Sequence, residues 1–139
     1  MRTLTSLAAA LLLIGVLAGC DDGKNPTSGS GANPLVGRWA FSSATMNSQP
    51  ITLSEMGMKS IILTFGADGT YTATVVDTSD VTDTDTGTWV ASGGNLILTD
   101  SEGNAETMPY TISGTTLTFS VTISDGTQTI TMVQNYTRQ

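Results

Sequence analysis

Histidine is absent from the 139-residue chain, and cysteine occurs once, at Cys20. Without histidine, the Ser–His–Asp and Cys–His arrangements of hydrolases and the histidine-based zinc sites are excluded. A single cysteine also excludes an intramolecular disulfide. The remaining candidates for acid–base chemistry are carboxylates, and we therefore expect a protein that is neither an enzyme nor a carrier of a cofactor. Nearly all of these carboxylates fall in predicted turns or loops: Glu55, Asp68, Asp100, Glu102, Glu106 and Asp125.

Basic side chains are scarce, with five Lys and Arg against twelve Asp and Glu and a formal net charge of −7. Affinity for nucleic acid depends on neutralising phosphates with Lys and Arg. Binding to anionic lipid headgroups depends on clusters of the same residues. The composition therefore disfavours both kinds of partner, and no nucleic-acid partner is expected. The negative charge instead favours solubility.

Long apolar runs are lacking except near the N-terminus, where Leu4–Val16 follows the basic Arg2. This run is shorter than the ~20 residues of a spanning helix and is typical of a secretory signal. The next four residues, Leu17-Ala18-Gly19-Cys20, resemble the lipobox of bacterial lipoproteins, in which the cysteine thiol receives a diacylglycerol. The resemblance implies a lipoprotein signal peptide over 1–19 and lipidation of Cys20. The alternative is an ordinary signal peptide followed by a chance cysteine.

Residues 20–34 then comprise the lipidated cysteine and a predicted flexible tether, because they are rich in Gly, Ser, Asn and Pro and contain no hydrophobic run. A chain of this kind reaches on the order of 20 Å. We expect a protein of the bacterial cell envelope, held by its N-terminal lipid to a membrane on the periplasmic or outer-surface side. Asp21 resembles an inner-membrane retention signal, but that rule is not universal, so the choice of membrane stays open.

Residues 35–139 form one predicted domain, in which polar and apolar residues alternate with a period of two. In Thr115–Ser124, for example, Leu117 and Phe119 share one face, and hydroxyl side chains share the other. Asp-Gly and Gly-Gly turns separate such segments. Short strands at this spacing predict an all-β, eight-stranded antiparallel up-and-down barrel with its apolar face inside. The expected strands are Val36–Thr45, Ser60–Phe65, Thr70–Val76, Gly87–Ala91, Asn95–Thr99, Thr107–Ser113, Thr115–Ser124 and Thr127–Thr137.

Four segments in this order resemble bacterial lipocalin-like domains, many of which are lipoproteins: "VGRWAF" (36–41), "LTFGADGTYT" (63–72), "GTW" (87–89) and the closing "NYTR". In lipocalins, the tryptophan of a Gly-x-Trp motif packs at the closed end of the barrel, under an arginine from the last strand. The resemblance carries these roles in barrel closure to Trp39 and Arg138. The domain is shorter than a typical lipocalin, which also allows a squat or partly open barrel.

An eight-stranded barrel either fills its interior with side chains or holds one small ligand. One hypothesis is therefore a membrane-anchored module that binds a small hydrophobic molecule or lipid inside the barrel. The segment Pro50–Lys59 is itself apolar and is predicted to cover the mouth as a short helix, lid or plug. The alternative is a filled-core module that inhibits or assembles with another envelope protein. The predicted ligand-binding residues are Phe41, Ile51, Leu53, Met56, Met58, Leu63, Phe65, Tyr71, Leu117, Phe119 and Met132.

The densest acidic segment, Asp77–Asp85, is predicted to be a solvated Thr-rich loop. Its Asp83-Thr84-Asp85 sequence weakly resembles a calcium loop. The spacing provides neither a third ligand nor a later bidentate glutamate in register. No metal site is therefore predicted, and calcium binding by this loop remains a minority hypothesis.

Overall fold

The computed structural model describes residues 33–124 and 126–139. The predicted signal peptide, Cys20 and residues 21–32 of the tether lie outside these ranges. In the described part of the chain, no helix is long and apolar enough to cross a membrane. The elements found there are nine strands: β1 (Gly37–Met46), β2 (Gln49–Ile51), β3 (Met58–Phe65), β4 (Thr70–Asp77), β5 (Thr82–Ser92), β6 (Asn95–Asp100), β7 (Ala105–Ser113), β8 (Thr116–Ser124) and β9 (Thr129–Arg138).

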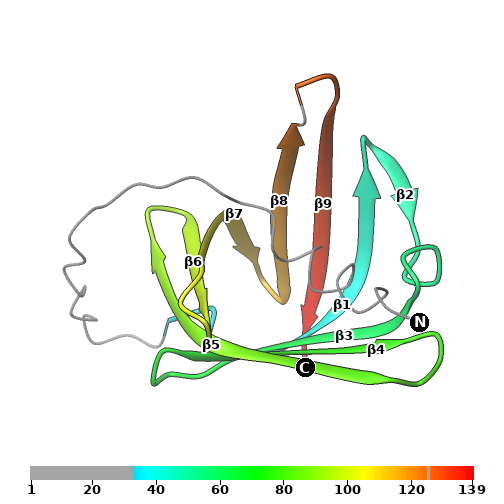
Figure 1. Cartoon of the computed structure of the whole chain (residues 1–139). Coiled ribbons are helices and arrows are strands. Elements are labelled where there is room, and N and C mark those ends of the chain that lie inside the picture. Colours follow the sequence, from blue (N-terminus) through cyan, green and yellow to red (C-terminus); the bar gives the residue numbers. More distant parts are fainter. Residues whose placement is uncertain (1–32, 125) are drawn as a thin grey trace.

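All neighbouring strands are antiparallel, in the order β2-β1-β3-β4-β5-β6-β7-β8-β9, and β1 also pairs with β9. The β1–β9 pairing closes an eight-stranded barrel, to which β2 is added. The first half of β1 (Gly37–Ala40) pairs with β3, whereas Ala44–Met46 pairs with β2. Figure 1 shows β8, β9 and β1 standing across β3, β4 and β5. The predicted antiparallel barrel is confirmed, and its sheet is closed.

Two segments differ from the sequence prediction. Pro50–Lys59 is not a helix, because Gln49–Ile51 forms the short strand β2 and Leu53–Gly57 forms turns before β3. The side chain of Glu55 accepts hydrogen bonds from the backbone N–H (2.7 Å) and the hydroxyl (2.8 Å) of Thr52, which closes this turn. The second difference is β5, which begins at Thr82 and not at Gly87, so the acidic segment is largely strand. Strand pairing to β4 overrides the low strand propensity of its aspartates.

The hydrophobic core lies inside the barrel, between the inward faces of the strands. The apolar face that was predicted to lie inside is mostly buried, and Phe41, Tyr110, Ile112 and Ile130 on this face are half-buried. Phe119 and Phe41 both pack edge-on against Tyr136, with ring centroids 5.7 Å apart in each pair. The largest side chains with less than 2% exposure are Trp39, Tyr136, Leu35, Leu96 and Leu117.

Candidate functional site

A small cavity opens between the inward faces of β3, β4, β5, β6 and the start of β7. Its volume is about 20 Å³, which is room for about one water molecule. Pockets that hold drug-sized ligands measure roughly 300–1,000 Å³, so a ligand enters only if neighbouring side chains move. The lining residues are Leu63, Phe65, Tyr71, Ala73, Asp85, Leu98, Asp100, Asn104 and Glu106.

Strand register places carboxylates on this inward face. Asp85 lies opposite the buried Ala73, and Glu106 lies opposite the buried Leu98. Because directly opposed residues in antiparallel strands project to the same face, both carboxylates face the interior with these apolar partners. Glu106 is only 7% exposed. The pocket therefore combines an apolar floor with an acidic rim.

Hydrogen bonds fix two of the acidic groups. The hydroxyl of Tyr71 donates to Oδ2 of Asp85 at 3.0 Å. Asp100 accepts from the backbone N–H groups of Glu102 and Asn104, both at 2.9 Å, and from Nδ2 of Asn104 at 2.9 Å. The Asp100 carboxylate thus organises the turn between β6 and β7 at the edge of the pocket.

These contacts shift two pKa values in opposite directions. Burial raises the pKa of Tyr71, and the hydrogen bond to Asp85 and the nearby carboxylates raise it further. The hydrogen bonds from Asn104 lower the pKa of Asp100. At neutral pH the pocket therefore presents a neutral phenol beside an ionised Asp100. Within the described ranges, no group of acidic or cysteine side chains is arranged to hold a metal ion.

Gly87 lies next to the pocket residue Tyr71, at a position where no Cβ atom fits. A Cβ atom at this position would lie 2.0 Å from the backbone oxygen of Thr99 and 2.8 Å from the ring of Tyr71. Two residues further along β5, Trp89 donates from Nε1 to the backbone oxygen of Gly66 at 3.0 Å and packs edge-on against Phe65. The "GTW" segment therefore positions one wall of the pocket.

The end of the barrel at which β1 begins is closed by Trp39 and Arg138. These two residues are directly opposed in the β1–β9 pairing, and Cζ of Arg138 lies 4.3 Å from the ring centroid of Trp39. The guanidinium also donates to the backbone oxygens of Pro34 and Val36. The indole donates from Nε1 to the backbone oxygen of Leu35 at 2.9 Å. These contacts tie the N-terminal segment to the last strand.

The sequence matches the lipocalin-like domain over residues 35–119, more than half of the chain. The chain belongs to the lipocalin-like domain family. Among solved structures, a lipocalin-like protein from Bacteroides uniformis is 13% identical, with a TM-score of 0.55 over 76% of this chain and 98% of that chain. An uncharacterized protein from Bacteroides eggerthii is 10% identical, with a TM-score of 0.51 over 76% and 99% of the two chains. At these identities the likeness shows the fold alone. No curated protein matches.

The predicted ligand-binding residues of this lipocalin-like domain lie in three places. Leu63, Phe65 and Tyr71 line the pocket. Met58, Leu117, Phe119 and Met132 are buried elsewhere in the core, and Phe41, Ile51, Leu53 and Met56 are half-buried. The prediction omitted the other lining residues, chiefly the carboxylates of Asp85, Asp100 and Glu106. The period-two pattern of the strands could have found them. If the strands had been extended with this pattern through the acidic residues, and not ended before them, these carboxylates would have been placed on the inward face.

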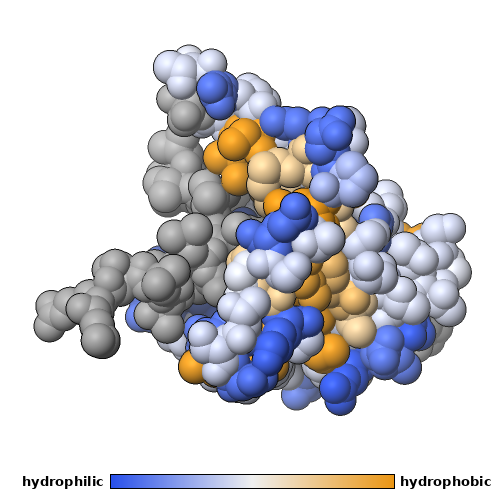
Figure 2. Space-filling view, turned by 90° about the vertical axis from the view of Figure 1, so that its right-hand side faces the viewer, coloured by the Kyte–Doolittle hydropathy of each residue, from blue (hydrophilic) through white to orange (hydrophobic). Residues whose placement is uncertain are grey.

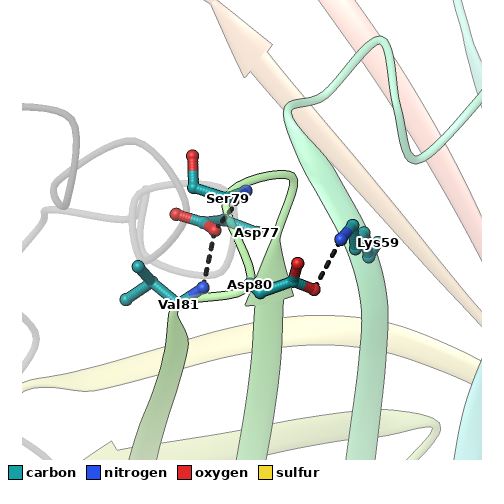
Figure 3. Close-up of polar contacts among 5 residues, drawn as sticks. All are labelled: Lys59, Asp77, Ser79, Asp80 and Val81. Atoms are coloured by element: carbon teal, nitrogen blue, oxygen red, sulfur yellow. Dashed lines mark hydrogen bonds and ion pairs between the residues drawn. The ribbon is translucent and has the colours of Figure 1, made fainter.

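The turn between β4 and β5 uses its carboxylates for local contacts (Figure 3). Oδ1 of Asp77 accepts from the backbone N–H groups of Ser79 (2.7 Å) and Val81 (2.9 Å). Asp80 pairs with Lys59 of β3, with 2.5 Å between Oδ1 and Nζ. Asp85 instead faces the pocket, so the acidic groups predicted to share one loop serve separate roles.

An apolar band marks the side of the molecule on which β2 lies. Figure 2 shows hydrophobic surface running down this face between hydrophilic flanks. Among the strands, register places Met46, Ile51 and Met132 on the inward face of the β2-β1-β9 sheet. Ile51 and Met46 are half-buried there, whereas Met132 is 4% exposed. The interior thus continues into partly exposed apolar surface.

Proposed function

We propose that the protein is a lipid-anchored binding protein of the bacterial cell envelope, and not an enzyme, whose barrel takes up a small hydrophobic molecule. The observation that carries this proposal is the apolar-floored pocket inside a closed lipocalin-like barrel. Leu63, Phe65 and Leu98 would contact the apolar part of the ligand. Because the cavity is small, binding requires rearrangement of the side chains that fill the interior.

The acidic rim selects among hydrophobic ligands. Asp85, Asp100 and Glu106 surround the pocket, and like charges repel more strongly where water is partly excluded. A fatty-acid carboxylate is therefore disfavoured. A neutral or cationic amphiphile, such as a long-chain amine, fits both the floor and the rim.

Competition against a neutral fluorescent probe, N-phenylnaphthylamine, tests this specificity. We expect dodecylamine to displace the probe at least about tenfold more tightly than dodecanoate. The preference should shrink in Asp85→Asn. It should persist in the matched control Asp83→Asn, because Asp83 lies two residues away on β5 and does not line the pocket. Absence of probe binding, or tighter binding of dodecanoate, would refute the proposal.

A second candidate function is an interaction module with a filled core. The observation that favours it is the cavity of only about 20 Å³. Native mass spectrometry of protein purified from a bacterial host separates the two functions. Copurification of a small molecule supports the binding protein. Consistently empty protein, together with reproducible crosslinking in cells to one envelope protein, supports the module.

The membrane anchor is tested separately through Cys20. We expect the wild-type chain to incorporate radiolabelled palmitate and to partition into the detergent phase of a cloud-point extraction. Cys20→Ser should do neither and should be recovered in the aqueous phase. Equal partitioning of the two chains would refute lipidation, and it would leave the ligand proposal untouched because the pocket lies entirely within the barrel.

A further inference from the structure

Strand β8 is paired along its whole length on one side and along only part of its length on the other. It pairs with β9 from Thr116 to Ser124. Its pairing with β7 covers only Thr116–Phe119. In the part of the chain that the structure describes, no strand pairs with the other side of residues 120–124, which we call the β8 edge. Figure 1 shows the tips of β8 and β9 projecting beyond the remainder of the barrel.

The β8 edge lacks the features that prevent sheets from joining at their edges. Natural edge strands carry lysines, prolines, bulges or inward-pointing charges for this purpose. The β8 edge reads Ser-Val-Thr-Ile-Ser and contains none of these residues. Its β-branched residues favour the extended conformation. Its register with β9 is continuous, without a bulge. The edge is therefore a template for one more antiparallel strand.

The sequence of this edge matches itself when it is reversed. With Thr122 opposite Thr122 of a second copy, Val121 would face Ile123 and Ser120 would face Ser124. Apolar residues then meet on one face and hydroxyls on the other, as antiparallel pairing requires. This register uses all five residues, whereas a shift in either direction uses fewer. We propose that two copies of the chain form a two-fold dimer by antiparallel pairing of their β8 edges.

Charge distribution supports a second copy as the occupant. The chain carries a net charge of −7, so most surfaces of two copies repel one another. The β8 edge carries no charged residue, and the only charged residue of the neighbouring β9 is Arg138, at its far end. Pairing here would join two β2-β1-β9-β8 arrays into one sheet. It would also cover the half-buried Val121 and Ile123.

Lysine substitutions test the dimer in the full chain purified from the expressing bacterium. In Thr122→Lys, two cations would face each other across the two-fold axis. The matched control is Thr131→Lys, because Thr131 lies opposite Thr122 on β9. Its two copies would be about 14 Å apart, three strand spacings. We expect sedimentation to give a dimer for wild type and Thr131→Lys and a monomer for Thr122→Lys. A monomeric wild type, or a dimer that Thr122→Lys leaves intact, would overturn the proposal.

Crosslinking gives a second readout that does not depend on destabilising the edge. Opposed strand residues lie within the Cα separation that a disulfide spans. Thr122→Cys should therefore form a disulfide-linked species of twice the chain mass under oxidising conditions. Thr131→Cys should not, because its copies are too far apart. Equal crosslinking of both variants, or crosslinking of Thr122→Cys to a chain of another mass, would contradict self-pairing. The latter result would indicate a foreign strand as the occupant.

Discussion

At the scale of single residues, Gly37 shows how the absence of a Cβ atom permits the closure of the barrel. Its φ angle is +139°, and a Cβ atom would lie 2.7 Å from Nη1 of Arg138. Arg138 is held in place by the backbone oxygens of Pro34 and Val36 and by Trp39. A larger residue at position 37 must therefore adopt a strained backbone and also displace the guanidinium.

We expect Gly37→Ala to lower the free energy of unfolding by about 2–3 kcal/mol, measured by urea denaturation. The control is Gly57→Ala, because Gly57 also has a positive φ, +74°, but no atom lies within 4 Å of the position that its Cβ would occupy. Its expected cost is about 1 kcal/mol, from backbone strain alone. If the two variants lose equal stability, Arg138 makes room for the new methyl group without cost, and the absence of a Cβ at position 37 is not needed for closure.

Two tyrosines give the protein a sensitivity to alkaline pH. Burial raises the pKa of Tyr71 and of Tyr136, and Asp85 adds to the effect at Tyr71. In the unfolded chain a tyrosine titrates near pH ~10. The folded state therefore holds these protons more tightly. The stabilisation is fully present below about pH 10 and is lost as the pH rises through the folded-state pKa values.

We expect the unfolding free energy to fall above about pH 10, and the fall to become shallower in Tyr71→Phe by about 1.4 kcal/mol per pH unit, the contribution of one proton. Urea denaturation at a series of alkaline pH values measures this slope. An unchanged slope in the variant would show that Tyr71 ionises as readily in the folded protein as in the unfolded chain.

The residues whose position could not be predicted from the sequence are polar residues that lie in the buried interior. Gln134 is buried because the hydroxyl of Tyr136 donates to its Oε1 at 2.8 Å and its Nε2 contacts the sulfur of Met132 at 3.1 Å. Glu106 is buried beside the pocket. Polarity alone predicts that both lie on the outside or in a turn, because a single sequence does not reveal the partner that makes burial of a polar group tolerable.

At the scale of elements, the strands with apolar alternation were predictable within one or two residues, and the others were not. β8 differs from its prediction only at Thr115. β5 begins five residues before its predicted start. The prediction missed these residues because the inward positions there carry Asp83 and Asp85, which give no apolar alternation. β2 has three residues including Pro50, too few to show a period. The acidic half of the pocket was missed for the same reason.

Gly87 is a position of β5 at which one added methyl group would clash with the neighbouring strand. In Gly87→Ala the new Cβ would lie 2.0 Å from a backbone oxygen of β6, which cannot move without breaking strand pairing. We expect a loss of about 3 kcal/mol in unfolding free energy, together with reduced binding of N-phenylnaphthylamine. Gly93→Ala is the control, because no atom lies within 4 Å of its Cβ position. Equal stability of the two variants would show that the β5–β6 contact relaxes freely.

At the scale of the whole molecule, the first and last strands of the barrel pair with each other along the length of β1, from Trp39–Arg138 to Met46–Met132. The barrel therefore cannot close before both ends of the domain are in place. Pairings this distant in sequence make folding slow, and closure makes the barrel one cooperative unit. The two tryptophans report on different strands of this unit, because Trp39 lies in the β1–β9 seam and Trp89 lies on β5.

We therefore expect the seam and the opposite wall to unfold together. In Trp89→Phe only Trp39 reports by fluorescence, and in Trp39→Phe only Trp89 reports. Each variant loses some stability, so the comparison is made within each chain, between the urea midpoint from fluorescence and the midpoint from far-ultraviolet circular dichroism. Coincident midpoints in both variants follow from cooperative closure. If Trp39 fluorescence changes at lower urea than the dichroism of the same chain, the seam opens first, and the barrel can admit a ligand through that opening without global unfolding.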